Sequence, residues 1–161
     1  MILKKENVNE AAKVFLTAQQ EAKNKRIDRM FADYPAIRQF LNDLDQGHPN
    51  EANKEVILQL LTIFYTAAVL QKIPLKNVDY DDILQSLDRN AALKRYLHGE
   101  KHAFDGQVFA ELVRQYPQKE ILNYTFFAIN NQFGDYVKEE RDALFIFYIV
   151  KSTADVMFRI T

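Results

Sequence analysis

Three histidines are the residues of this chain whose type and spacing best fit a reactive centre. They are His48, His98 and His102, and the last two are four positions apart. On a helix that spacing places both imidazoles on one face, as a site for zinc or another divalent cation requires, and His48 would supply a third ligand from another segment. The alternative interpretation is that all three are solvent-exposed histidines in loops.

The histidine pair belongs to a segment that resembles a known family. His98-Gly99-Glu100-Lys101-His102 is followed by Gly106-Gln107-Val108 and then by Leu112-Val113-Arg114-Gln115. This run resembles the late helix of the DinB/YfiT family. The resemblance implies a four-helix bundle of similar length that binds a divalent metal through one early histidine and a later pair, which would give the ligand role to His48, His98 and His102.

Two sets of charged residues have a simpler structural interpretation. Asp79, Asp81 and Asp82 lie where a helix is expected to begin, and the helix dipole favours negative charge there. Lys151 and Asp155 are four positions apart on the predicted last helix, a spacing that permits an ion pair. We expect both sets to stabilise helices.

Nucleophile and phosphate-binding motifs are missing from the sequence. The only serines are Ser86 and Ser152, and neither lies in a Gly-x-Ser-x-Gly motif. Four glycines are too few and too scattered for a Walker loop or a dinucleotide fingerprint. The sequence therefore contains no motif for a nucleotide cofactor and leaves the cofactor unknown; a metal at the histidines is the candidate that it offers.

Aromatic residues are concentrated at the end of the chain, where 9 of the 20 Phe and Tyr lie between residues 117 and 161. Neighbours on a helix point about 100° apart, so in Phe126-Phe127 and Phe147-Tyr148 one ring can enter the core while the other lies near its edge. Aromatic side chains at such edges often anchor interfaces or line apolar pockets. We predict that role for Phe126, Phe127, Phe147 and Tyr148; the alternative is that two surrounded helices simply bury them.

The charge balance argues against a general affinity for nucleic acid. The net charge is −1, from 21 basic and 22 acidic residues. The first 32 residues carry seven basic and four acidic side chains, and four of the basic ones are close together: Lys23, Lys25, Arg26 and Arg29. We interpret these as a solvated helix face; contact with RNA or an acidic partner is the alternative.

Location is suggested by what the composition lacks. The chain has no cysteine and no apolar run of signal-peptide length at its start. Its longest apolar stretch, from Val56 to Leu70, is shorter than the roughly 20 residues of a membrane-spanning helix. We expect a cytoplasmic protein that does not enter a membrane.

Two long helices are expected to form the core. The segment from Glu55 to Ile73 is apolar except for one stripe, formed by Glu55, Gln59, Thr62 and Thr66. A stripe so narrow indicates a helix surrounded on most sides, with these four residues facing outwards. The segment from Ala143 to Ile160 begins with eight apolar residues and should lie beside it.

Shorter helices should cover this centre. Apolar spacing predicts a first helix from Asn7 or Asn9 to about Ala32, and Pro35 and Pro117 each suit the first turn of a later helix. Asn90 is expected to cap a short helix that ends near Gly99. The fold class is therefore all-α, a single domain of residues 1–161 with six to seven helices around two buried ones.

The sequence favours a non-catalytic interaction protein that uses aromatic helix faces to self-associate as a homodimer or to bind a protein partner. The rival interpretation is a DinB-like, metal-dependent helical-bundle enzyme that uses the three histidines. A helical binder of small apolar ligands is a third.

Overall fold

The computed structural model is helical throughout and describes residues 1–47, 51–99, 106–137 and 139–159. These residues form eight α-helices and no strand. In chain order they are α1 (Lys5–Thr17), α2 (Gln20–Asp33), α3 (Pro35–Gly47), α4 (Glu51–Leu70), α5 (Tyr80–Gly99), α6 (Gly106–Gln115), α7 (Lys119–Asn130) and α8 (Glu140–Met157). The predicted all-α class is confirmed, with one helix more than the expected maximum of seven.

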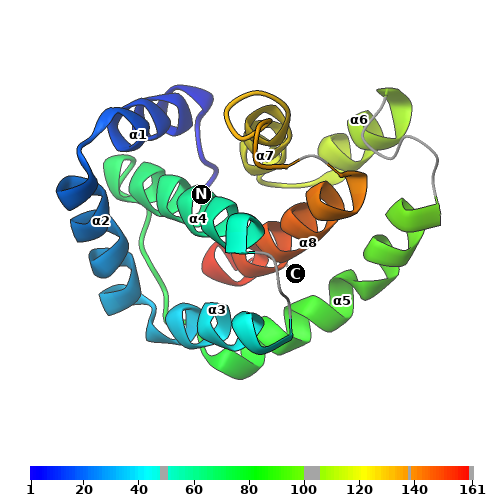
Figure 1. The fold of residues 1–161 in the computed structure, drawn as a ribbon, viewed down its shortest axis with the longest axis horizontal. Helices are drawn as coiled ribbons and strands as arrows, with labels where there is room; N and C mark the ends of the chain where they lie inside the picture. The colour runs from blue at the N-terminus through cyan, green and yellow to red at the C-terminus, as the bar shows by residue number, and fades with distance from the viewer. Residues whose placement is uncertain (48–50, 100–105, 138, 160–161) are drawn as a thin grey trace.

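The additional helix comes from a break in the predicted first helix. Ala18 (φ −71°, ψ 152°) and Gln19 (φ −69°, ψ 157°) are both extended, so α1 ends and α2 begins in a new direction. No glycine or proline marks this point in the sequence. Because α1 and α2 both pack against α4, the chain must turn here to follow the side of the central helix (Figure 1).

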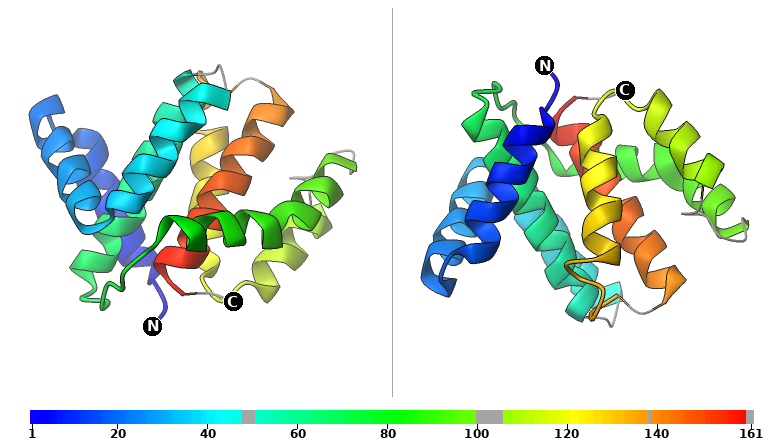
Figure 2. Two further views of the ribbon diagram at one scale, coloured as in Figure 1. Left: turned by 90° about the horizontal axis from the view of Figure 1, so that it is seen from below. Right: turned by 90° about the horizontal axis from the view of Figure 1, so that it is seen from above.

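The centre of the fold is formed by α4 and α8, as predicted. The two helices pack against each other, and the remaining helices lie around them (Figures 1 and 2). α4 has 20 residues and is long and apolar enough to span a membrane by length and composition, although most of it is buried within the fold. The helix is thus longer than the apolar run seen in the sequence, and its burial is that of a core helix.

The predicted outward stripe of α4 is only half correct. Glu55 is exposed and Gln59 is half-buried, but Thr62 and Thr66 are buried. The hydroxyls of both threonines form hydrogen bonds within the helix: Thr62 donates to the carbonyl of Leu58 and Thr66 to that of Thr62, each at 2.8 Å. α2 packs over this part of α4, so the two threonines face another helix rather than water.

Of the two prolines predicted to begin a helix, one does so. α3 begins at Pro35, as predicted, whereas Pro117 lies in a turn and α7 begins at Lys119. α5 continues from Tyr80 to Gly99 without interruption, so Asn90 does not cap a helix. Its side chain is buried against α8 instead.

Two glutamines hold the first residues of the chain against the fold. The Gln118 amide accepts from the backbone N–H of Leu3 at 2.9 Å and donates to the Met1 carbonyl at 2.7 Å. The Gln71 amide accepts from the backbone N–H of Lys4 and donates to the Ile2 carbonyl. Each side-chain amide thus pairs with the main chain as a neighbouring strand would, and Leu3 is carried into the core.

Candidate functional site

The four aromatic residues predicted as an interface or pocket do not share one surface. Phe126 of α7 is half-buried and stacks on Phe109 of α6, with ring centroids 4.5 Å apart. Phe109 also meets the buried ring of Phe147 of α8 edge-on, with centroids 6.0 Å apart. These three rings form an inner cluster that joins α6, α7 and α8.

Tyr148 and Phe127 lie elsewhere. The Tyr148 hydroxyl donates to the carbonyl of Leu87 at 2.8 Å and so ties α8 to α5; burial and the nearby charge of Asp88 raise its pKa. Phe127 is 49% exposed, and its ring lies beside that of Tyr124, with centroids 6.2 Å apart. Of the four predicted residues, Phe127 is therefore the one that offers a large apolar surface to a partner.

Phe127 borders a surface groove between α1 and α7. The groove has a volume of about 370 Å³. It is lined by Lys5, Val8 and Asn9 from α1 and by Glu120, Asn123, Tyr124 and Phe127 from α7. Glu120, Asn123, Tyr124 and Phe127 recur at steps of three, one and three, which places them on one face of α7. The groove also contains one cation, Lys5 of α1, and one anion, Glu120 of α7, and neither forms an ion pair with another described residue.

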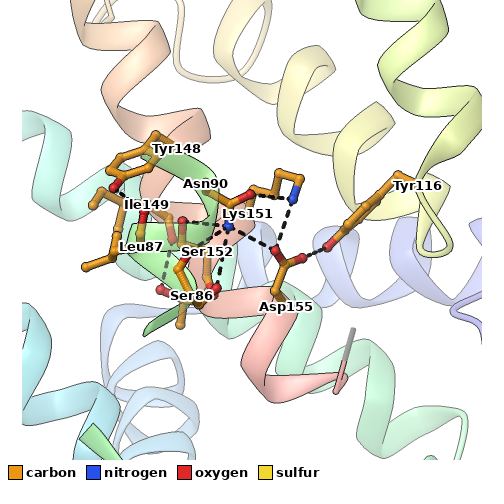
Figure 3. A network of polar contacts seen from close by, with 10 residues as sticks. Ser86, Leu87, Asn90, Tyr116, Tyr148, Ile149, Lys151, Ser152 and Asp155 are labelled. Atoms are coloured by element: carbon orange, nitrogen blue, oxygen red, sulfur yellow. Dashed lines mark hydrogen bonds and ion pairs between the residues drawn. The ribbon is translucent and has the colours of Figure 1, made fainter. Parts of the chain in front are cut away.

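A buried polar network lies where α5 and the end of α6 meet α8 (Figure 3). Its centre is the carboxylate of Asp155, whose side chain is 7% exposed. Lys151 and the Asn90 amide each donate to one oxygen of Asp155 at 3.0 Å, and the Tyr116 hydroxyl donates to the other at 2.5 Å. The Lys151 ammonium also donates to Asn90 at 2.8 Å and lies 4.8 Å from the centre of the Tyr116 ring. The predicted Lys151–Asp155 ion pair is confirmed.

Serine side chains extend the network toward the backbone. The Ser86 hydroxyl donates to the Ser152 carbonyl at 2.6 Å, and the Asn90 amide reaches the Ser86 carbonyl at 3.0 Å and the Ser152 hydroxyl at 3.1 Å. Together these bonds connect α5 and α8 over a full turn of each helix (Figure 3).

The electrostatics of this network suit a structural role. Burial of the Tyr116 hydroxyl raises its pKa, and so do the negative charge of Asp155 and the hydrogen bond to it. The phenol therefore stays protonated and acts as a donor. The buried carboxylate is compensated by a cation and two neutral donors, which is what a buried charge needs. The polar groups of the network are hydrogen-bonded to one another. The network therefore holds α5, α8 and the segment that follows α6 together and does not present a reactive group.

The sequence predicted the contact between Lys151 and Asp155 of this network but not the contacts of Asn90 and Tyr116 with Asp155. Lys151 and Asp155 share a helix, whereas Asn90 and Tyr116 come from other segments and have no local signal that links them to α8. One clue was available: Ile83, Ser86, Leu87 and Asn90 are spaced as the inner face of a helix, so two polar side chains fall at core positions. Buried polar groups require partners, and these could have been sought on another helix.

The predicted metal ligands are not described by the structure. His48 and His102 fall outside the described residues, and so does the side chain of His98, although its backbone belongs to the last turn of α5. Within the described part of the chain, no three His, Asp or Glu side chains come together as a metal site. The histidine site stays a prediction.

Comparisons with protein-family models, curated proteins and solved structures give no match to this chain. The resemblance of the segment from His98 to Gln115 to the DinB/YfiT family is thus not extended by a family match. The four-helix bundle that this resemblance implied is also not the observed fold, because six helices surround α4 and α8 within the described residues.

Proposed function

We propose that this protein is a helical interaction protein that associates with a second copy of itself through the groove between α1 and α7. The observation that supports this most directly is Phe127, a large aromatic side chain that is half-exposed on a helix of the core. Aromatic residues of this kind often anchor protein interfaces, since they remove much apolar area from water at a small cost in side-chain entropy.

The charges of the same face favour a second copy as the partner. In a twofold dimer the same patch lies on both subunits, so a residue of one patch meets a different residue of the other. We infer that Lys5 of one copy pairs with Glu120 of its partner, a contact that the symmetry would repeat. A face that carries both signs beside an apolar ring is therefore complementary to itself.

The mass of the purified protein in solution tests this proposal. Size exclusion with light scattering at several concentrations should give about twice 18.8 kDa. Phe127→Glu should return the chain to the monomer, because it places a charge at the centre of the contact. Tyr136→Glu is the matched control, since Tyr136 is a 62% exposed aromatic outside the groove, and this variant should keep the mass of the dimer.

A charge exchange tests the geometry of the pairing. Lys5→Glu and Glu120→Lys should each weaken the dimer by about tenfold, since two symmetry-related contacts become repulsive. An equal mixture of the two variants should regain the dimer, because opposite charges then meet at both contacts. A monomer at every concentration, or a dimer that is indifferent to Phe127→Glu, would show that this face is not an interface between copies.

A further inference from the structure

A second groove lies between α2 and α4, on a surface that the proposed dimer does not use. Its volume is about 340 Å³. From α2 it is lined by Ala22, Lys25, Arg26 and Arg29, which recur at steps of three, one and three and so form one stripe. From α4 it is lined by Tyr65, Thr66, Val69 and Leu70.

The α2 side of the groove is positively charged. Its three cations face no carboxylate among the groove-lining residues. Lys25 reaches Glu21 at 3.9 Å, but both side chains are largely exposed, so this pair is weak. Arg26 and Arg29 form no ion pair with a described carboxylate. Asp33, the last residue of α2, accepts a hydrogen bond from the Tyr65 hydroxyl.

The α4 side of the groove is apolar at its open end. Val69 and Leu70 are 41% and 49% exposed, although they belong to the last turn of the most apolar helix of the fold. Tyr65 and Thr66 form the floor and are buried. The groove therefore places an apolar strip, formed by Val69 and Leu70, beside a row of cations on α2, and a complementary ligand has an apolar side next to an acidic one.

Shape and exposure distinguish between ligands of that kind. Small-molecule sites bury about 70–90% of the ligand, whereas the apolar residues here are open to water along one side. Single-stranded RNA needs accessible aromatic rings for stacking, and the one aromatic ring of the groove, Tyr65, is only 3% exposed. An amphipathic helix that lies along the surface fits an apolar strip beside a row of cations, because it presents apolar residues at i, i+3, i+4 and i+7 beside a charged edge.

We propose that the groove between α2 and α4 binds an acidic amphipathic helix of a partner protein, with the apolar face of that helix on Val69 and Leu70 and its acidic edge along Lys25, Arg26 and Arg29. This binding surface is separate from the α1–α7 face, so it does not depend on the proposed dimer.

A model peptide can test the proposal on the full chain. The probe is a fluorescein-labelled helical peptide with leucine at i, i+3, i+4 and i+7 and glutamate along one adjacent edge. A second peptide has the same composition in a scrambled order without an amphipathic face. Fluorescence anisotropy should show saturable binding of the first peptide and at least about tenfold weaker binding of the second, and higher salt should weaken the first because charges contribute to it.

Two sets of variants locate the site. Arg26→Gln/Arg29→Gln removes two cations, and Val69→Ser/Leu70→Ser removes the apolar strip; each should weaken peptide binding by about tenfold. Arg89→Gln/Lys119→Gln removes the same charge from exposed positions of α5 and α7 and should leave binding unchanged. Circular dichroism of every variant should show the same helix content and melting temperature, since all six residues lie at the surface or at its edge.

Three results would overturn the proposal. Equal binding of the scrambled peptide would mean that charge alone attracts it, and equal binding by the groove variants would place the site elsewhere. Tighter, Arg26- and Arg29-dependent binding of an oligouridine or of dodecanoate, measured by competition with the peptide, would assign the groove to RNA or to a small amphiphile instead. The oligomeric state does not enter this readout, so failure here and failure of the dimer are distinguishable.

Discussion

Tyr34 and Tyr116 are both buried tyrosines, but their hydroxyls differ in hydrogen bonding. The Tyr116 hydroxyl donates to Asp155 inside the polar network. The Tyr34 hydroxyl is buried and has no hydrogen-bond partner among the residues that the structure describes, while its ring packs edge-on against Tyr65. An unpaired buried hydroxyl lowers stability, because the group has lost its water and gained nothing in return.

The two tyrosines form a matched pair for substitution by phenylalanine. Tyr116→Phe should lower the free energy of unfolding by about 1–3 kcal/mol, since Asp155 then loses a donor in a buried site. Tyr34→Phe should be neutral or slightly stabilising, because the ring contact with Tyr65 is kept and no hydrogen bond is lost. Urea denaturation followed by circular dichroism measures both; equal losses for the two variants would contradict this account.

At the scale of the helix, the break between α1 and α2 is a feature of backbone conformation. Gln19 has a φ of −69°, close to the value that a proline ring imposes, and Ala18 before it has the extended backbone that a following proline requires. Within the described part of the chain, the backbone N–H of Gln19 donates no backbone hydrogen bond outside the helices. The position therefore meets the backbone requirements of proline.

Gln19→Pro should stabilise the protein by up to about 1 kcal/mol, because it restricts the unfolded chain at no cost to the folded one. Lys13→Pro, inside α1, is the control and should cost about 3 kcal/mol or more. Thermal unfolding by calorimetry separates the two. If Gln19→Pro were as damaging as Lys13→Pro, residues 5–33 would form one continuous helix in solution, as the apolar spacing alone suggested.

The polar network also acts at the scale of elements. α5 contributes one face to the core, and that face contains Ser86 and Asn90 where apolar residues would be expected. Because these side chains bond specific groups of α8, a shift of α5 along α8 by one turn would leave them unpaired. The network thus fixes the register of two helices that apolar contacts alone would hold less specifically.

At the scale of the whole molecule, several buried tyrosines make stability depend on alkaline pH. Burial raises the pKa of both Tyr34 and Tyr65 to about 12, with Asp33 contributing through its charge and, for Tyr65, through a hydrogen bond. Tyrosines of the unfolded chain ionise near pH 10. Below about pH 10 both states keep these protons, so their contribution to stability is complete there.

Between about pH 10 and 12 the unfolded chain releases these protons and the folded chain holds them, so the free energy of unfolding should fall as pH rises. Urea unfolding at a series of pH values in this range measures the fall. Ultraviolet absorbance of phenolate supplies a second measure: in the folded protein it should lag behind that of the urea-unfolded chain at the same pH. Identical phenolate titrations of the two states would show that the tyrosines are not buried as described.

Properties that depend on spacing within one helix were determined by the sequence. The all-α class, the central positions of α4 and α8 and the Lys151–Asp155 ion pair all follow from periodicity along a single segment. The opposite behaviour of neighbouring rings in Phe126-Phe127 follows from the same 100° step.

Properties that depend on which helices meet were decided by the tertiary structure. Thr62 and Thr66 are polar and were expected at the surface, but α2 covers them. Asn90 and Tyr116 join Asp155 only because three distant segments pack together. Arg26 and Arg29 become part of an amphipathic groove only because α2 turns at Gln19 and lies beside the exposed end of α4. Local spacing specifies the face of one helix, whereas the partner of that face is chosen by packing the whole chain.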